Sequence, residues 1–191
     1  MRAINRQSTE DAVRRLGVCD GDVVVEIGAG FGFGIRALSA AGLQGLDVWA
    51  VEISAKFRKE LRASTGLPES RIVDADAKAM PFLADESVDK ILAVNVVYFL
   101  SPLAEYLREI RRVLRPGGVA LLACKWPLVK GAEPPFVNTS AAAVHEAMRA
   151  AGFELSVEDV NLSALGDAKY SYQAVFCRKP PTAATISGVQ K

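Results

Sequence analysis

Residues 23–34 read VVVEIGAGFGFG, and this stretch decides the fold predicted for the 191-residue chain. The apolar run Val23–Ile27 lacks alternation, which is typical of a strand covered on both faces of a parallel sheet. Glycines then follow at every second position, at Gly28, Gly30, Gly32 and Gly34. Because glycine permits positive φ and close approach of a ligand to the backbone, the stretch predicts a nucleotide-binding loop.

Strand and helix patterns alternate along the rest of the chain. Further strands are expected at 47–53, 70–76, 88–96, 119–124, 153–160 and 170–177. Helices are expected at 9–16, 35–42, 55–64, 102–114 and 141–152, with Ser54 and Ser140 as N-caps. The alternation predicts an α/β fold, doubly wound around a mostly parallel seven-stranded sheet. No helix separates the last two strands, so the last strand is expected to be antiparallel.

Composition and charge exclude several functional classes. The net charge is +1 with 24% charged residues and no basic stripe, so nucleic acid is not an expected partner. The three cysteines and single histidine lack metal-ligand spacing, and unpaired cysteines suit the reducing cytosol. No segment reads as a secretory signal or a membrane span. We therefore expect a cytoplasmic protein with no metal, a single domain over residues 1–179 and a disordered tail over 180–191.

The spacing of the glycines argues against a nicotinamide dinucleotide domain. That fold carries the fingerprint G-x-G-x-x-G. Counted from Gly28, the third glycine would fall at position 33, where the chain has Phe33. The chain also lacks a Y-x-x-x-K pair. A nicotinamide-dependent oxidoreductase is therefore the weaker alternative for an enzyme.

Acidic residues are expected at the ends of the next two strands. Glu52 follows the glycines by about twenty residues, where a carboxylate can accept hydrogen bonds from both ribose hydroxyls. Asp76 can accept a hydrogen bond from an adenine amino group while the Ala77 N–H donates to the ring, and Asp74 competes for this role. Since the carboxyl ends of parallel strands meet at one edge of the sheet, these residues predict one adenosine site.

Together these motifs resemble the Rossmann-like, class I family of S-adenosylmethionine-dependent methyltransferases. VVVEIGAGFG looks like the family's glycine motif, VDKILAVNVVYFL like its fourth-strand motif, and REIRRVLRPGGVALLA like its helix and fifth strand. The resemblance covers about residues 9–178 and implies S-adenosyl-L-methionine as cofactor. The near-neutral charge favours a small-molecule methyl acceptor over RNA or DNA and leaves a protein acceptor open. It implies that Glu26 orders the loop around the methionine end and that Asn95 lies near the sulfonium. The full set of expected cofactor-binding residues is Glu26, Gly28, Ala29, Gly30, Gly32, Glu52, Ile53, Asp76, Ala77 and Asn95.

The acceptor side is less defined by the sequence. Tyr98, just beyond the fourth strand, is the candidate catalytic residue through contact with the acceptor, although VVYFL could simply pack the next helix. Lys125 and Trp126 could line the same mouth. His145 is expected on a helix as a surface or partly buried residue rather than a base. The acceptor and its attacking atom stay unidentified.

Two features leave alternatives to a self-contained enzyme open. Related sequences often carry a histidine after the fourth strand, and here Val97, Tyr98 and Phe99 occupy that stretch. The cover over the acceptor is expected to be short or absent, so a second copy in a homo-oligomer could supply it. A non-catalytic subunit that binds S-adenosylmethionine, or an inactive partner subunit, is the third hypothesis.

Overall fold

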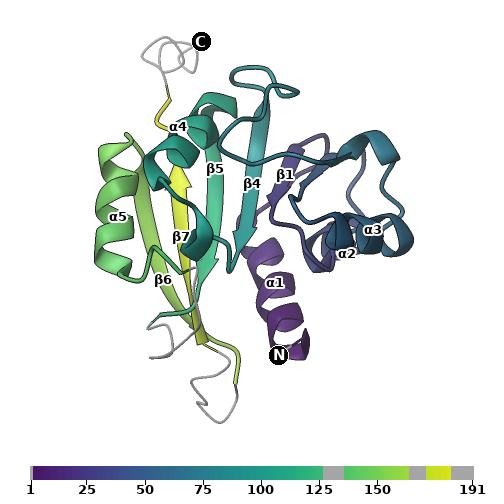
Figure 1. Cartoon of the computed structure of the whole chain (residues 1–191), viewed down its shortest axis with the longest axis horizontal. Helices are drawn as coiled ribbons and strands as arrows, with labels where there is room; N and C mark the ends of the chain where they lie inside the picture. Colours follow the sequence, from purple (N-terminus) through teal and green to yellow (C-terminus); the bar gives the residue numbers. More distant parts are fainter. Residues whose placement is uncertain (1, 127–135, 164–170, 182–191) are drawn as a thin grey trace, which may run out of the picture.

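The computed structural model describes residues 2–126, 136–163 and 171–181, which build one sheet with helices on both faces (Figure 1). The strands are β1 (Val23–Ile27), β2 (Asp47–Val51), β3 (Ile72–Val73), β4 (Val88–Val94), β5 (Leu114–Cys124), β6 (Glu154–Asn161) and β7 (Ser171–Arg178). The helices are α1 (Arg2–Leu16), α2 (Phe33–Ala40), α3 (Ala55–Ser64), α4 (Leu103–Val113) and α5 (Ala141–Ala150), with short 3₁₀ helices η1 (Glu69–Arg71) and η2 (Val97–Phe99).

The strand order confirms the predicted fold class. The seven strands lie in the order β3-β2-β1-β4-β5-β7-β6. All pairs from β3 to β5 are parallel, whereas β7 is antiparallel to both of its neighbours. The chain leaves β1 toward one edge of the sheet and returns at β4 on the other side of β1. Ligands of such sheets bind at this switch point, beyond the carboxyl ends of the strands.

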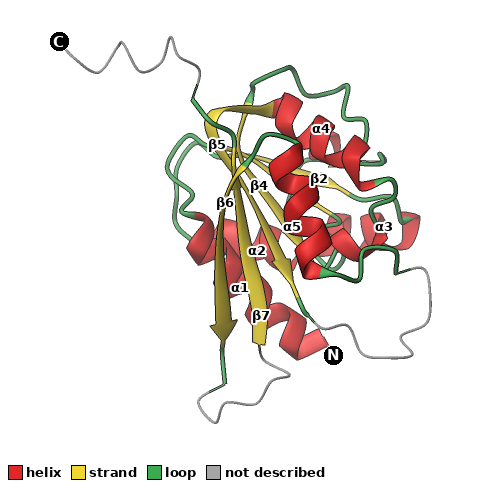
Figure 2. Ribbon diagram, turned by 90° about the vertical axis from the view of Figure 1, so that its left-hand side faces the viewer, coloured by secondary structure: helices red, strands yellow, loops and turns green. Residues whose placement is uncertain are grey.

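Side chains on successive strand residues point to opposite faces and build separate cores. Val24 of β1 and Leu92 of β4 pack with α1 and α2, whereas Val25 and Ile91 pack with α4 and α5. Figure 2 shows α1 and α2 on one side of the sheet and α4 and α5 on the other. Burial on both faces explains why the strands read as continuous apolar runs.

A segment without a helix connects β3 to β4. Residues 74–87 form turns that cover the neighbouring strands, with Met80 fully buried. The Phe82 ring stacks on Trp49 of β2, with 5.4 Å between the ring centroids. The segment thus fills the space that a crossover helix would otherwise occupy and brings residues 75–77 to the carboxyl edge of the sheet.

Several predicted boundaries shift in the structure. Helix α1 begins at Arg2 rather than at residue 9, and β3 contains only two residues. Asp76 therefore lies three residues beyond β3 instead of ending it, because only Ala50 and Val51 of β2 offer pairing partners. The N-caps are confirmed: the Ser54 and Ser140 hydroxyls accept from backbone N–H groups three residues on.

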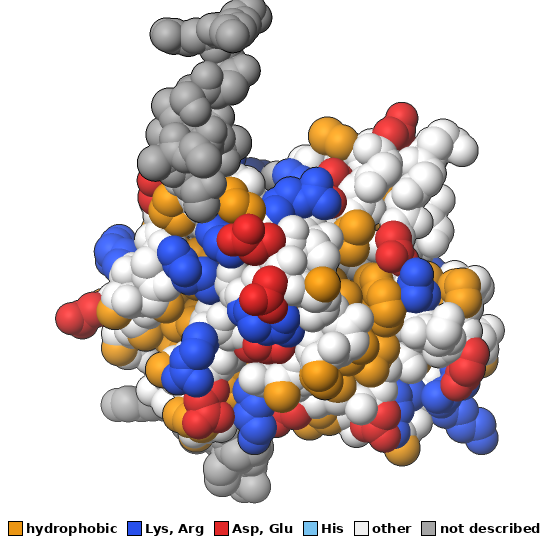
Figure 3. Space-filling view, turned by 90° about the horizontal axis from the view of Figure 1, so that it is seen from above, with side chains coloured by type: hydrophobic (Ala, Val, Ile, Leu, Met, Phe, Trp, Pro, Cys, Tyr) orange, Lys and Arg blue, Asp and Glu red, His pale blue; other side chains and the backbone are white. Residues whose placement is uncertain are grey.

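The structure describes only part of the segments predicted to form the last connecting loop and the C-terminal tail. Most of the predicted connecting loop and of the tail, residues 164–170 and 182–191, lies outside the described residues. No helix in the described part is long and apolar enough to cross a membrane. On the face seen from above, basic and acidic side chains are interspersed (Figure 3).

Candidate functional site

A cavity of about 380 Å³ opens at the carboxyl ends of β1, β2 and β4. Nine of the ten predicted cofactor-binding residues line it, all except Gly32. The cavity therefore brings together the glycine loop, the acid after β2 and the acid after β3, which are separated by up to fifty residues in the sequence. Its size is within the range of small-molecule pockets.

The glycine loop adopts a backbone that other residues would strain. Gly28, Gly30 and Gly32 have φ values of +66°, +51° and +70°, in the left-handed region. A Cβ atom on Gly28 would also lie 2.7 Å from Cγ2 of Val96, which follows β4. Only glycine permits both this turn and this close approach.

The side chain of Glu26 lies beneath the loop, 3% exposed. Its Oε2 accepts a hydrogen bond from the Ile35 N–H at 2.9 Å, and the Gly34 N–H donates to it as well. Burial raises the pKa of Glu26 to about 8, although these hydrogen bonds oppose the increase. Glu26 thus ties the end of β1 to the start of α2.

This contact explains the last glycine of the stretch. A Cβ atom on Gly34 would lie 2.7 Å from the carboxyl carbon of Glu26, closer than side-chain atoms can approach. Gly32 has a different role, because a Cβ there would lie 2.9 Å from Cδ2 of Leu61 in α3. Gly32 thus lets α2 and α3 pack closely; it is not among the described residues that line the cavity, and its contact with a cofactor stays a prediction.

Backbone hydrogen bonds orient Glu52 at the rim of the cavity. Its Oε2 accepts from the Gly30 N–H at 2.9 Å and its Oε1 from the Ser54 N–H at 2.8 Å. The residue is 7% exposed. Each carboxylate oxygen retains a lone pair, so the group can accept further hydrogen bonds from a ligand.

The structure distinguishes the two candidate acids after β3. Asp74 forms an ion pair with Arg58, with 2.6 Å between Oδ2 and Nη2, and is not among the described lining residues. Asp76 lines the cavity. Burial favours a higher pKa for Asp76, but hydrogen bonds from Tyr106 and Lys78 outweigh it and lower the pKa. Burial and the contact with Asp76 raise the pKa of Tyr106 to about 12.

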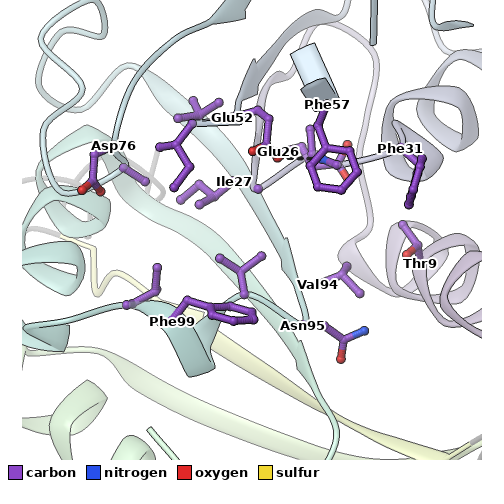
Figure 4. A pocket seen from close by; sticks show the side chains of 18 of the residues that line it. Thr9, Glu26, Ile27, Phe31, Glu52, Phe57, Asp76, Val94, Asn95 and Phe99 are labelled. Atoms are coloured by element: carbon purple, nitrogen blue, oxygen red, sulfur yellow. Dashed lines mark hydrogen bonds between the residues drawn. The ribbon is translucent and has the colours of Figure 1, made fainter. Parts of the chain in front are cut away.

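The opposite wall is mostly apolar and comes from the end of β4 and from η2. Phe99 faces Ile27 and Glu26 across the cavity, and Asp76 and Phe31 lie toward its two ends (Figure 4). Asn95 lines this wall with φ +56°, a conformation that asparagine adopts more readily than most residues.

The structure favours the packing interpretation of Tyr98. The residue is 3% exposed and is not among the described residues that line the cavity. Its hydroxyl donates to the Lys125 carbonyl at 3.1 Å, and its ring packs edge-on against Trp126. The neighbouring Phe99 lines the cavity instead, and a contact between Tyr98 and an acceptor stays a prediction. Burial raises the pKa of the Tyr98 phenol above its ordinary range.

The other suggested acceptor-side residues also lie away from the cavity. Lys125 and Trp126 are not among its described lining residues, and His145 lies on α5. The described residues contain no group of three or more side chains that could bind a metal ion.

Sequence reasoning missed the wall that α1 contributes. Asn5 and Thr9, one helical turn apart, line the cavity, so the first half of α1 partly covers the site. Asp11 anchors this helix by accepting hydrogen bonds from the Tyr172 hydroxyl at 2.7 Å and the Arg15 Nε at 2.6 Å. The spacing of Asn5 and Thr9 was visible in the sequence, but nothing in the sequence indicated that α1 reaches the cavity.

Comparison with protein families gives a match over the core of the chain. A family model described as a methyltransferase domain matches residues 25–122, which span the glycine loop, Glu52, Asp76 and most of β5.

Among curated proteins, the chain is 35% identical over 105 residues to phthiotriol/phenolphthiotriol dimycocerosates methyltransferase 1 of Mycobacterium ulcerans. The match covers 53% of this chain and 36% of that protein. The chain spans 36–43% of the length of the curated relatives that it matches first.

Solved structures share the fold over nearly the whole chain. A chain from the complex of the Haloferax volcanii Trm112 methyltransferase activator has a TM-score of 0.80 at 21% identity, covering 94% of this chain and 91% of that one. A SAM-dependent methyltransferase from Aquifex aeolicus has a TM-score of 0.71 at 20% identity, covering 90% and 89%. Because the sequence identities are only 20–21%, these two matches show a shared fold.

Proposed function

The chain belongs to the methyltransferase domain family, and on that premise we propose that it transfers a methyl group from S-adenosyl-L-methionine to a small-molecule acceptor. The observation that carries the proposal is that the glycine loop, Glu52 and Asp76 line one and the same cavity. These groups come from three successive strand ends, and each offers a contact that one part of an adenosine-containing ligand needs.

The residues that line the cavity fit this cofactor. Glu52 has lone pairs free beyond its two backbone hydrogen bonds, as the two ribose hydroxyls require. Asp76 and the Ala77 N–H would hold the adenine, and Ile53 would pack beside it. A Cβ on Gly30 would meet no atom closer than 3.7 Å, so its bare backbone faces open space. Glu26 would order the loop at the methionine end.

The proposed catalysis depends on alignment. When bound, S-adenosylmethionine supplies an electrophilic methyl group on a positively charged sulfur. The apolar wall of Val94, Val96 and Phe99 would exclude water and hold the acceptor in line with the bond that breaks. The aromatic face of Phe99 could also stabilise nearby positive charge.

The described lining supplies no uncommitted general base. Its ionisable side chains are Glu26, Glu52, Asp76 and Tyr106, and each is engaged by hydrogen bonds within the protein. The acceptor we propose is therefore one whose attacking atom needs no prior removal of a proton by the enzyme.

Calorimetry with S-adenosylmethionine, S-adenosylhomocysteine and NADH tests the cofactor. We expect both sulfur ligands to bind, and tight NADH binding without response to either would contradict the proposal. A screen for transfer of a labelled methyl group to metabolite and protein pools then separates an enzyme from a non-catalytic binding subunit, because only the enzyme gives turnover.

We do not propose that this chain methylates the compounds for which its relatives are named. The Mycobacterium ulcerans relative is named for phthiotriol and phenolphthiotriol dimycocerosates, but the chain covers only 36% of it. We propose a cytoplasmic location, in keeping with three unpaired cysteines. A homo-oligomer stays a prediction, and size measurement in solution tests it.

A further inference from the structure

The segment between β3 and β4 carries part of the cavity lining without any regular structure of its own. Residues 75–77 line the cavity, and the whole segment, residues 74–87, contains no helix or strand. The Asp76 carbonyl accepts a hydrogen bond from the Ala79 N–H at 2.9 Å, which closes a turn directly before the fully buried Met80. Because ordering such a segment costs backbone entropy, the position of Asp76 depends on the contacts that hold the segment.

One arginine of α4, Arg112, holds the segment beyond that turn. A guanidinium has five N–H donors, and Arg112 makes five hydrogen bonds. Two go to the Glu109 carboxylate, at 2.7 and 2.8 Å. The other three go to the Met80 carbonyl at 3.0 Å, the Leu83 carbonyl at 3.0 Å and the Asp85 carboxylate at 2.6 Å. A single side chain thus attaches three residues of the segment to α4.

Glu109 completes the attachment at Met80. Its Oε1 accepts from the Met80 N–H at 2.5 Å and from Nη2 of Arg112 at 2.7 Å. The side chains of Arg112 and Glu109 are 30% and 13% exposed, so solvent screens this ion pair less than a fully exposed one. Met80 is therefore held at both its N–H and its carbonyl by one charged pair.

The same helix also contacts Asp76 directly. Tyr106, one helical turn before Glu109, lines the cavity and donates a hydrogen bond to the Asp76 carboxylate. Helix α4 thus holds the segment near its start through Tyr106 and in its middle through Arg112. Because Arg112 is not among the described residues that line the cavity, it would affect a ligand only through this segment.

We propose that Arg112 is a positioning residue for the cofactor, which holds the turn before Met80 so that Asp76 selects a purine with a 6-amino group. The inference rests on the proposed function, in which Asp76 accepts from the adenine amino group and the Ala77 N–H donates to the ring. An ionised carboxylate accepts hydrogen bonds but cannot donate them, so in this position it disfavours a 6-oxo purine. A lysine in place of Arg112 would keep the charge but lose the planar fork that bridges the segment and Glu109.

Calorimetry with S-adenosylhomocysteine and with S-inosylhomocysteine, its 6-oxo analogue, tests the inference without requiring turnover. We expect the unchanged protein to bind the 6-amino ligand about tenfold more tightly or better. Arg112→Lys should lower this ratio of affinities by about threefold or more, as the weakening of one hydrogen bond would. A merely structural role of Arg112 would instead weaken both ligands by the same factor and leave the ratio unchanged.

The matched control is Arg115→Lys. Arg115 forms an ion pair with Asp89, with 2.5 Å between Nη1 and Oδ1, at the amino end of β4 and thus away from the cavity. This variant disturbs an arginine–aspartate pair of the same kind, so we expect it to keep the ratio of the unchanged protein.

Glu109→Gln provides a second variant, which decides the question where Arg112→Lys does not fold. The amide keeps an oxygen for the Met80 N–H but loses the charge that faces Arg112, so its ratio should lie between those of Arg112→Lys and the unchanged protein. Equal affinity of the unchanged protein for the two ligands, or an unchanged ratio in both variants, would overturn the inference and leave the proposed function intact. Absence of any binding of S-adenosylhomocysteine would overturn the proposed function and this inference with it.

Discussion

The two walls of the cavity are built in different ways. On the glycine-loop wall, Glu26 and Glu52 are buried carboxylates held by backbone N–H groups within nine and twenty-two residues. On the opposite wall, the side chain of Asn138 clamps η2 from about forty residues away. The first wall is polar and locally organised, whereas the second is apolar and depends on distant packing. The difference indicates that the conformation of the first wall depends mainly on local backbone contacts, whereas that of the second depends on a segment distant in the sequence.

The largest expected effect tests the burial of Glu26. In the folded protein its pKa is raised from 4.5 to about 8, so the folded state retains a proton that the unfolded state loses. Without cofactor, the free energy of unfolding should therefore fall between pH 4.5 and 8. At about 1.4 kcal/mol per pKa unit, the decline is on the order of 5 kcal/mol. Urea denaturation at several pH values gives the free energy of unfolding of the unchanged protein and of Glu26→Gln. The same pH dependence in both proteins would contradict a raised pKa of Glu26.

The second prediction asks whether the polar wall binds the cofactor. Glu52→Ala removes hydrogen bonds to a charged acceptor and should weaken S-adenosylhomocysteine binding by about 1.5–3 kcal/mol in calorimetry. Asp74→Ala is the control, since Asp74 is exposed and engages Arg58 instead. Unchanged affinity in Glu52→Ala, or equal losses in both variants, would show that the ribose is wrongly assigned.

The third prediction concerns the close contact between Gly34 and the carboxyl group of Glu26. Gly34→Ala forces a methyl group against the Glu26 carboxyl and should cost about 1–3 kcal/mol of stability. The cost should shrink in a Glu26→Ala background, because the clash is removed. Gly42→Ala, with φ +73° and no atom within 4 Å, is a control for strain alone and should cost the same in both backgrounds. Thermal denaturation of the double-mutant cycle gives the coupling.

The smallest effect is expected on the apolar wall. Tyr98→Phe loses two hydrogen bonds with Lys125, because the Tyr98 hydroxyl donates to its carbonyl and accepts from its N–H, and should lower stability by about 1–2 kcal/mol. Because Tyr98 is buried away from the cavity, methyl transfer to an acceptor found in the labelled screen should keep its rate. A large fall in kcat with unchanged stability would restore Tyr98 as a catalytic residue.

Much of the fold was predictable from local patterns. The apolar runs predicted the strands and the absence of a helix before the last strand predicted its direction, as the pairing of β7 confirms. Boundaries were less predictable, because pairing partners set them. The strand predicted to end at Asp76 had seven residues, yet only two residues of β3 pair with β2.

The candidate site was predictable on one wall only. Glycines at alternate positions indicate a particular backbone conformation, and acidic residues after apolar runs indicate where strands end. Both are local properties of the chain. Tyr98 and Phe99 were not separable, because adjacent residues of a 3₁₀ turn point in different directions. Which of them is buried depends on residues 136–138 packing against that turn.

By itself, the sequence determined the sheet, the family resemblance and the polar wall, because the residues responsible act through their own backbone or that of near neighbours. Tertiary structure alone decided that α1 covers the cavity with Asn5 and Thr9 and that Phe99 faces it. It also decided the role of Gly34, whose missing Cβ leaves space for the Glu26 carboxyl. These features depend on contacts between segments far apart or on the direction of a single side chain, which no pattern along the chain records.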